Sequence, residues 1–365
     1  MKASGAQTVL ITGGAGFIGC NLAEYLLRET DAQVRILDNL SRRGVEHNVE
    51  WLQSLRCTSR LEIIKGDVRD AHVVGDAMRN VSDVFHLAAQ VAVTTSIEDP
   101  ETDFETNALG TLRVLEAARK SSRKPFLLFT STNKVYGSLN GVPVQKSDTR
   151  YEAKAPKFRG VSEEEQLDFH SPYGCSKGAA DQYVRDYARI YGLPTVVFRM
   201  SCIAGPRQFG NEDQGWVAHF LYSALAGQPI NIYGDGKQVR DVLHVQDLVA
   251  AMMAARNHRR TSQGQIYNLG GGMARSTSVI EMLRSIETQL GHPLDLRYSR
   301  VRPGDQPLYI SDTAKFERET GWRARHSLSD ILSGIREFWC ANEGAIRRQQ
   351  SAALPTVEML AEEVA

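Results

Sequence analysis

The chain has 365 residues, 42% of them hydrophobic and 24% charged, which is an ordinary globular composition and a length that suits two domains. Its 43 Lys and Arg residues balance 43 Asp and Glu residues, and this lack of a basic surplus argues against nucleic acid as the partner. No apolar run reaches the roughly 18 residues that span a bilayer, and five scattered cysteines without a CxxC pair favour a reducing cytoplasm over a disulfide framework or a metal site.

The first 200 residues alternate short apolar runs with segments of helical periodicity. Runs typical of strands lie at residues 8–11, 33–37, 61–64, 84–87, 126–129 and 195–198. Helical spacing of apolar residues is found between them, at residues 17–27, 49–55, 71–78, 104–118 and 173–191. Continuous apolar strands that alternate with helices indicate a parallel sheet covered on both faces. The pattern therefore predicts an α/β fold with a doubly wound parallel sheet.

The chain beyond residue 200 is less regular and is interrupted more often by glycine and proline. We expect helices at 218–226, 248–255, 279–290 and 328–339, and strands at 230–233 and 266–269. Such punctuation is typical of a smaller domain that covers a substrate. The predicted organisation is a first domain over 1–200 with later returns near 236–272, a smaller, mainly substrate-binding C-terminal domain over 201–341, and an irregular tail over 342–365.

A glycine-rich turn joins the first predicted strand to the first predicted helix. It reads GGAGFIG, with glycines at GxxGxxG spacing, and it could be an ordinary strand-to-helix turn. In this context, however, such glycines allow a tight turn, close approach of a pyrophosphate and close helix packing, while the helix N–H groups face the phosphates. We therefore predict a Rossmann domain whose dinucleotide contacts include Gly13, Gly16, Phe17, Ile18 and Gly19.

The end of the second strand indicates which dinucleotide binds. Asp38 and Asn39 lie about 20 residues beyond the turn, where a carboxylate accepts from both ribose hydroxyls and repels the 2′-phosphate of NADP. NAD is therefore the expected cofactor, although Arg42 and Arg43 follow closely enough to meet such a phosphate. Two residues after the third strand are expected at the adenine edge, Asp67 and Val68.

A tyrosine and a lysine four residues apart form the candidate catalytic pair. On a helix, Tyr173 and Lys177 lie on one face. The ammonium is expected to lower the pKa of the phenol from about 10 towards neutrality, so that the tyrosine can remove an alcohol proton during hydride transfer. The run that includes Thr130 and Thr132 ends a strand, where a hydroxyl can bond the substrate oxygen, and Asn107 lies in the preceding helix. Together these parts predict an oxidoreduction site.

This combination resembles the extended short-chain dehydrogenase/reductase (NAD-dependent epimerase/dehydratase) superfamily over residues 7–340. The motifs that carry the resemblance are GGAGFIG, the Asp38 turn, HLAA, NALGT, the TST run, YGCSK and FRMSCIAGPRQ. The resemblance implies that Thr132, Tyr173 and Lys177 are the catalytic hydroxyl, base and lysine, and that Lys177 also holds the nicotinamide ribose. It further implies NAD contacts by Leu87, Ala88, Ala89, Asn107 and Thr130.

Longer strings narrow the choice within the superfamily. The 4,6-dehydratases carry an Asp-Glu pair after the catalytic Thr, whereas this chain has Asn133 and Lys134, so dehydration is disfavoured. The strings VAVTTSIEDP (91–100), STNKVYG (131–137), QLDFHSPYGCSKGAADQY (166–183), DQGWV (213–217) and GKQVRDVLH (236–244) are similar to the CDP-tyvelose 2-epimerase (CDP-paratose 2-epimerase) family. A nucleotide-sugar 4-epimerase of the UDP-glucose type and a non-catalytic NAD-binding protein stay as alternatives.

The resemblance implies a substrate and a route. No carbonyl adjoins C2 of the nucleotide sugar, so its hydrogen is not acidic, and oxidation to a 2-keto sugar with hydride return to the opposite face avoids that obstacle. Arg240 and Arg302 would clamp the diphosphate of a CDP-sugar, because guanidinium forks match phosphate oxygens, and Asp305 would lie near the nucleotide ribose. Further substrate contacts are expected from Thr132, Asn133, Arg207, Gln208 and Tyr233. The resemblance also implies a homodimer or a higher homo-oligomer, because in this superfamily the two long helices, here at 104–118 and 173–191, often form a four-helix bundle between subunits.

Overall fold

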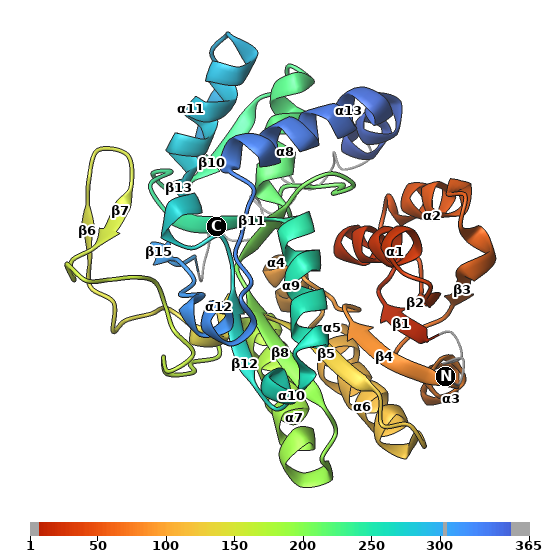
Figure 1. Ribbon diagram of the computed structural model, residues 1–365. Helices are drawn as coiled ribbons and strands as arrows, with labels where there is room; N and C mark the ends of the chain where they lie inside the picture. Colours follow the sequence, from red (N-terminus) through yellow and green to blue (C-terminus); the bar gives the residue numbers. More distant parts are fainter. Residues whose placement is uncertain (1–6, 302–304, 352–365) are drawn as a thin grey trace.

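A seven-stranded parallel sheet organises the computed structural model, which describes residues 7–301 and 305–351. Its strand order is β3-β2-β1-β4-β5-β8-β12, so the predicted doubly wound sheet is confirmed (Figure 1). Most positions of β1, β4, β5 and β8 are buried, as strands covered on both faces require. The strands are β1 (Thr8–Thr12), β2 (Gln33–Asp38), β3 (Leu61–Lys65), β4 (Val81–His86), β5 (Phe126–Thr132), β8 (Thr195–Met200) and β12 (Ile266–Leu269).

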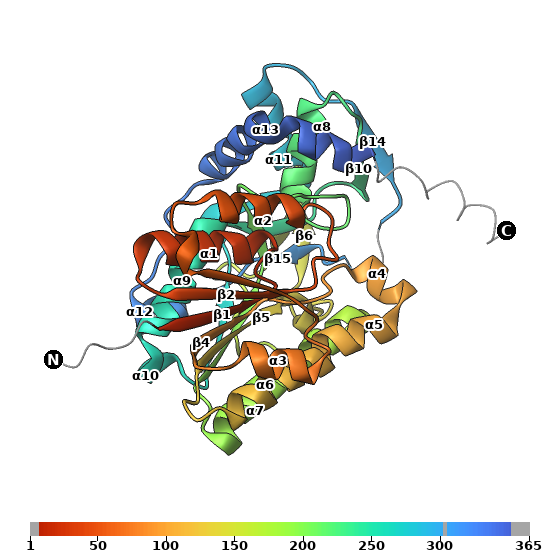
Figure 2. The same ribbon diagram turned by 90° about the vertical axis from the view of Figure 1, so that its right-hand side faces the viewer.

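Helices cover both faces of this sheet, as Figure 2 shows from its edge. One face packs against α1 (Phe17–Glu29), α2 (Val45–Ser54), α9 (Val245–Asn257) and α12 (Ala314–Thr320). The short α10 (Arg259–Ser262) follows α9 and contacts it. The other face packs against α3 (Ala71–Ala77), α6 (Gly110–Lys120) and α7 (Ser171–Tyr191). A short η1 (Thr58–Arg60) precedes β3. No helix among the residues that the structure describes is long and apolar enough to cross a membrane.

The predicted regular helix at 104–118 is interrupted in the structure. Helices α4 (Val93–Glu98) and α5 (Pro100–Phe104) precede a π turn, η2 (Glu105–Leu109), which continues into α6. The Gly110 N–H bonds the carbonyl of Glu105, five residues back, and the hydroxyl of Thr111 donates to the Asn107 carbonyl at 2.6 Å. Such π turns are frequent at functional sites, and this one contains a predicted site residue, Asn107.

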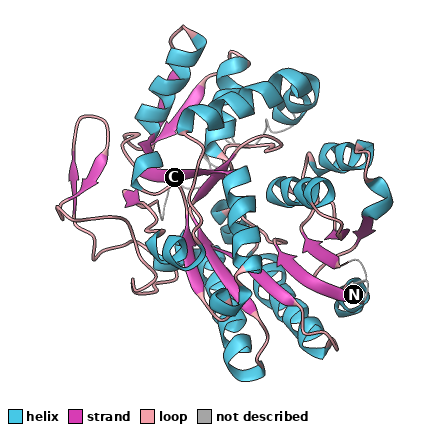
Figure 3. Ribbon diagram, viewed as in Figure 1, coloured by secondary structure: helices cyan, strands magenta, loops and turns pink. Residues whose placement is uncertain are grey.

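A second, smaller apolar core lies beside the carboxyl end of the sheet, in the upper part of Figure 1. It is built by α8 (Trp216–Leu225), α11 (Val279–Leu290), α13 (Leu328–Ser351) and the parallel pair β10 (Ile230–Tyr233) and β14 (Leu296–Ser299). Strand β11 (Val239–His244) pairs with β9 (Cys202–Ala204), β13 (Ser276–Ser278) and β15 (Leu308–Tyr309). The remaining elements are η3 (Asn133–Tyr136), η4 (Met273–Arg275) and the hairpin β6 (Val144–Lys146) and β7 (Tyr151–Ala153), which projects at the left of Figure 3.

The prediction of an irregular tail from residue 342 was wrong for its first ten residues. Helix α13 continues to Ser351 across a kink at Asn342, where φ is −133°. The reason is packing, because Ile346 is 2% exposed and belongs to the same apolar cluster as Trp339 and Tyr222. The remainder of the predicted tail, 352–365, lies outside the described residues.

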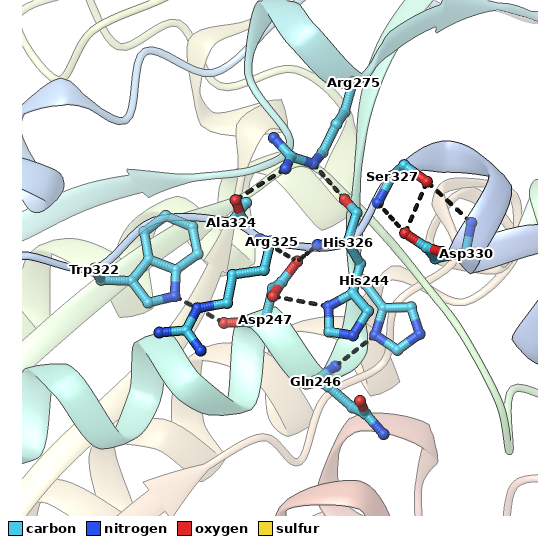
Figure 4. Close-up of polar contacts among 10 residues, drawn as sticks. All are labelled: His244, Gln246, Asp247, Arg275, Trp322, Ala324, Arg325, His326, Ser327 and Asp330. Carbon is cyan, nitrogen blue, oxygen red and sulfur yellow. Dashed lines mark hydrogen bonds and ion pairs between the residues drawn. The ribbon is translucent and has the colours of Figure 1, made fainter.

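One carboxylate on α9 fastens the chain segment that leads into α13 (Figure 4). Asp247 accepts hydrogen bonds from the backbone N–H groups of Arg325 (3.1 Å) and His326 (3.0 Å), and its other oxygen contacts His326 Nδ1 at 2.9 Å. The Asp247 carbonyl also accepts from Trp322 Nε1 at 3.0 Å. The His326 ring stacks on His244 with centroids 4.2 Å apart. This side chain therefore ties the sheet-covering helix to the smaller core.

Replacing Asp247 with Ala is expected to lower the free energy of unfolding by about 1–3 kcal/mol, because it leaves the backbone N–H groups of Arg325 and the half-buried His326 without their charged acceptor. Urea denaturation measures the change. Glu343→Gln is the control, since its ion pair with Arg347 is exposed on α13 and contributes less than about 0.5 kcal/mol. Equal midpoints for Asp247→Ala and wild type would contradict the role of Asp247.

Candidate active site

Three loops meet at the carboxyl edge of the sheet, where the strand order reverses. The glycine-rich turn follows β1, residues 87–90 follow β4, and η3 follows β5. Strands β1 and β4 are neighbours, and the chain leads outward from them in opposite directions. Ligands of doubly wound folds bind at this switch point.

The glycine-rich turn has the shape of a phosphate cradle. Gly13 has φ +71°, and a Cβ there would lie 2.7 Å from the backbone N of Ala88, so only glycine fits. A Cβ on Gly19 would collide with the backbone of Gly13 and Gly14. Gly16 is the N-cap of α1, which has no side-chain cap and no acidic residue in its first turn. The first N–H groups of α1, including those of Phe17 and Ile18, therefore suit an anionic pyrophosphate.

The residues predicted around the adenosine lie together beyond the ends of β2 and β3. Asp38 accepts hydrogen bonds from the backbone of Ala15 (3.0 Å) and Leu40 (2.9 Å), which joins it to the glycine-rich turn. Burial raises the pKa of Asp38, against the effect of these two bonds. Asn39 donates to Asp67 at 3.0 Å, so both predicted sides of the nucleoside are linked. The residue after Asp67, Val68, is buried beside Gly110.

The structure brings the predicted catalytic residues together. The Tyr173 side chain is hydrogen-bonded to that of Thr132, and Tyr173 is 9% exposed. Lys177 Nζ donates to the Thr130 carbonyl at 2.6 Å and lies 4.1 Å from the centroid of the Phe129 ring. The long helix α7 thus presents a phenol and an ammonium to the end of β5, as the spacing of Tyr173 and Lys177 predicts.

The expected effect of the lysine on the tyrosine is not seen. Burial raises the pKa of Tyr173 to about 12, although the hydrogen bond between the Tyr173 and Thr132 side chains opposes the shift. Burial also lowers the pKa of Lys177 to about 7, against the charges of Asp181 and Asp103. The prediction of a lowered phenol pKa was therefore wrong for this structure, because the lysine donates to a carbonyl while desolvation dominates at the hydroxyl.

A buried polar network behind the pair was missed by the sequence reasoning. Asp103 is fully buried and accepts hydrogen bonds from Ser176 Oγ (2.5 Å) and Asn107 Nδ2 (3.0 Å). Asn107 also exchanges two hydrogen bonds with the backbone of Gln90, at 2.9 and 3.0 Å. A signal was available, because Asp103 precedes Asn107 by one helical repeat and Ser176 precedes Lys177 directly. The network fixes the π turn against α7.

Two of the predicted substrate-binding residues, Arg240 of the diphosphate clamp and Asp305 near the nucleotide ribose, lie together. Arg240 is 8% exposed and donates to Asp305 at 2.6 Å and to the carbonyl of Gln306 at 2.7 Å. The other predicted clamp, Arg302, lies outside the described residues. Near Arg240, Cys202 accepts a hydrogen bond from Trp216 Nε1 at 3.3 Å.

The remaining predicted substrate contacts have protein partners. Asn133 follows Thr132 directly, and its amide oxygen accepts from that hydroxyl at 3.4 Å. The guanidinium carbon of Arg207 lies 3.1 Å from the Trp51 ring centroid, on the side of α2. Gln208 donates a hydrogen bond to the Ile203 carbonyl at 3.1 Å. The hydroxyl of Tyr233 donates to the Glu212 carboxylate at 2.5 Å. Their contact with substrate stays a prediction.

Comparisons with known proteins agree with this geometry. The model of the GDP-mannose 4,6-dehydratase family matches residues 10–335. CDP-paratose 2-epimerase of Salmonella typhi is 42% identical over 91% of this chain and 98% of its own. The UDP-glucose 4-epimerase of Thermotoga maritima, solved with UDP-glucose, superimposes with TM-score 0.79 at 30% identity over 92% of this chain and all of its own. DesIV, a dTDP-glucose 4,6-dehydratase of Streptomyces venezuelae solved with NAD, gives TM-score 0.79 at 29% identity over 93% and 98%.

Proposed function

The chain belongs to the GDP-mannose 4,6-dehydratase family, within the NAD-dependent epimerase/dehydratase superfamily, and on that premise we propose that it is an NAD-dependent CDP-sugar 2-epimerase. The reaction is the interconversion of CDP-paratose and CDP-tyvelose by transient oxidation at C2. The observation that carries the proposal is the union of Thr132, Tyr173 and Lys177 at one sheet edge, with Asn133 and Lys134 following Thr132.

The residues present fit NAD. The glycine cradle, the uncapped α1 N-terminus and the Asp38 carboxylate would hold the pyrophosphate and the adenosine ribose. Lys177, beside the Thr130 carbonyl, would hold the nicotinamide ribose. When bound, NAD supplies reversible hydride transfer at the sugar carbon.

The chain's own groups manage the proton and the position of the sugar. Tyr173, whose pKa is about 12 in the chain without cofactor, would take the proton of the 2-hydroxyl once the positive charge of bound NAD lowers that pKa, and would later return a proton to the same oxygen. Thr132, bonded to the tyrosine hydroxyl, orients that oxygen. The buried Asp103–Ser176 bond, at 2.5 Å, holds the helix turn that carries both Tyr173 and Lys177. These roles require water to be excluded from the site, and all three catalytic side chains are less than a tenth exposed.

The residues after Thr132 favour epimerisation over dehydration. Elimination of water needs an acid and a base beyond the hydroxyl–Tyr–Lys set, and an amide supplies neither. Asn133 is 8% exposed and its oxygen accepts from Thr132. The next residue, Lys134, is a cation where the dehydratases are expected to carry a carboxylate.

The decisive experiment is product analysis by NMR after incubation with CDP-paratose and, separately, with UDP-glucose. Conversion of CDP-paratose to CDP-tyvelose supports the proposal. Inversion of UDP-glucose at C4 alone would transfer the assignment to a 4-epimerase, a candidate favoured by the structural similarity to the Thermotoga maritima enzyme. No turnover of either would favour a non-catalytic NAD-binding protein.

The purified protein is expected to carry NAD(H) and to need no added cofactor. The reason is that an epimerisation returns the cofactor to its starting oxidation state in every cycle, so turnover does not require the cofactor to dissociate. Acid extraction followed by chromatography measures the bound nucleotide. Protein that is empty and turns over only with stoichiometric NADP would contradict both the tight binding and the preference for NAD.

We also propose that the protein forms a homodimer. Large apolar side chains on α5 and α7 are exposed, among them Phe104 (56%), Tyr183 (49%) and Ile190 (66%). Such side chains are typical of a surface that packs on a partner. Light scattering measures the mass in solution. A cytoplasmic location stays a prediction from the cysteine content.

A further inference from the structure

Helix α7 begins with an unusual turn. Ser171 has φ +64°, a left-handed conformation that is uncommon for a residue with a side chain, and it precedes Pro172, which has no N–H group. The N-cap residue, His170, makes no side-chain cap hydrogen bond. Backbone in such a conformation persists only where the surrounding structure holds it. The proposed base, Tyr173, comes next in the chain, so the contacts that hold this turn also hold the base.

Two serine hydroxyls cap the first N–H groups of this turn. The Ser171 hydroxyl accepts from the N–H of Gly174 at 3.2 Å, which is a local cap. The N–H of Tyr173 instead donates to Ser96 Oγ at 3.2 Å, and Ser96 lies on a different helix, α4. Ser96 is fully buried, and its own hydroxyl donates to the Val93 carbonyl at 2.7 Å. Ser96 therefore caps α7 from a neighbouring helix, in a place that bulk water does not reach.

The carbonyl of Tyr173 is held as well. It lies 3.2 Å from Ser176 Oγ, whose hydroxyl contacts the fully buried Asp103 on α5 at 2.5 Å. Both polar groups of the Tyr173 backbone are therefore tied to the neighbouring helices α4 and α5. A tyrosine ring turns about only two side-chain bonds, so a fixed backbone leaves the phenol little freedom.

Helix α4 directly continues the loop that follows β4. This loop, residues 87–92, passes the glycine-rich turn, where a Cβ on Gly13 would lie 2.7 Å from the backbone N of Ala88. The last residue of the loop is the N-cap residue of α4, and its carbonyl accepts from the Gln90 side chain at 2.9 Å. Ser96 is thereby linked to the segment that is expected to contact NAD.

We propose that Ser96 is a positioning residue that sets the place of the Tyr173 phenol relative to Thr132 and to residues 87–92. Its hydroxyl oxygen is engaged by Tyr173 and Val93, so it acts through the backbone of the base and not on the substrate. Without this acceptor the first turn of α7 can shift, and the phenol moves with it. This inference rests on the proposed function only in taking Tyr173 as the base.

Ser96→Ala tests this role, because it removes the acceptor and leaves the rest of α4 unchanged. The assay uses NAD-loaded enzyme and the nucleotide sugar that the wild type turns over, CDP-paratose or UDP-glucose. We expect kcat to fall by roughly 10- to 100-fold, the range that misplacement of a reacting group by up to about 1 Å produces. Binding of the matching nucleoside diphosphate, measured by isothermal titration, should stay close to that of the wild type. Ser96→Thr keeps the hydroxyl and is expected to recover most of the kcat.

Ser262→Ala is the matched control. Ser262 is also fully buried, and its hydroxyl donates to a helix carbonyl, that of Ala255, at 2.7 Å, the same distance as between Ser96 and Val93. Ser262 lies just before β12, at the edge of the sheet opposite the site. Both alanine variants should lower the melting temperature, whereas only Ser96→Ala should lower kcat. An equal loss of kcat in the two variants, at equal NAD content, would overturn the inference, because it would reflect stability alone.

The position of the phenol gives a readout that does not depend on turnover. Crystal structures of the NAD-loaded wild type and of Ser96→Ala would give the distance between Tyr173 Oη and Thr132 Oγ1, which we expect to lengthen by about 0.5–1 Å. An unchanged distance, or an unchanged kcat, would contradict the role of Ser96. If the wild type turned over neither sugar, the proposed function would fail, and this distance would still decide the inference. If Ser96→Ala did not fold, Ser96→Cys would take its place, because a thiol fills the same site but is a weak acceptor.

Discussion

Tyr173→Phe is expected to lower turnover by about two to four decades, the usual range for loss of a general base. The phenol is 9% exposed and hydrogen-bonded to Thr132, where the proposed reaction removes the proton of the 2-hydroxyl. Removal of one oxygen leaves the ring and its packing in place, so substrate affinity should change little. Steady-state kinetics on the CDP-sugar, with ligand affinity measured separately, would show a fall in kcat with nearly unchanged binding.

Tyr187→Phe is the matched control on the same helix. Tyr187 is 6% exposed, and its hydroxyl donates to Glu116 at 2.8 Å, away from the sheet edge that carries Thr132 and Tyr173. Removal of the Tyr187 hydroxyl should therefore leave kcat close to that of the wild type. If Tyr173→Phe kept more than about a tenth of the activity, another group would have to serve as the base. If both variants lost activity equally, the effect would be one of helix packing.

The parallel sheet could be predicted from sequence because its strands are short, apolar runs between helices, a pattern that buried parallel strands impose. Strand β11 could not, although all six of its residues are buried. Its run VRDVLH contains Arg240, Asp241 and His244, and polar residues rarely indicate a buried strand. They are tolerated because specific bonds satisfy them, such as those from Ser201 and Ser311 to Asp241. Such compensation depends on residues distant in the chain.

In the candidate site, too, the features set by local sequence could be predicted, whereas those set by residues distant in the chain could not. Local spacing on one helix predicts that Tyr173 and Lys177 share a face, and the strand end before them places Thr132. The direction of the Tyr173 pKa shift could not be predicted, because it depends on how completely tertiary packing removes water from the hydroxyl. The hydrogen bond between Asp103 and Ser176 likewise joins two helices through residues that are 73 positions apart in sequence.

In heavy water the product is expected to have an inverted C2 and no deuterium on that carbon. An epimerase that removed the C2 hydrogen as a proton would exchange it with solvent before returning it. In the proposed route the proton handled by Tyr173 belongs to the hydroxyl oxygen, and solvent exchange at that oxygen leaves the carbon unlabelled. Mass spectrometry and NMR of the product measure the label.

The carboxylate that acts on the pKa of Tyr173 is not available as a base for a carbon-bound proton. This carboxylate is Asp103, which is fully buried and already accepts from Ser176 and Asn107. Deuterium at C2 would therefore exclude the hydroxyl-oxidation route and require a group other than Asp103 to remove the carbon-bound proton. Inversion at C4, with C2 unlabelled and unchanged, would instead mean that Thr132 and Tyr173 keep their roles but act on the 4-hydroxyl of the sugar. Tyr173→Phe in the same solvent is the control, because loss of the hydroxyl base should suppress inversion at either carbon.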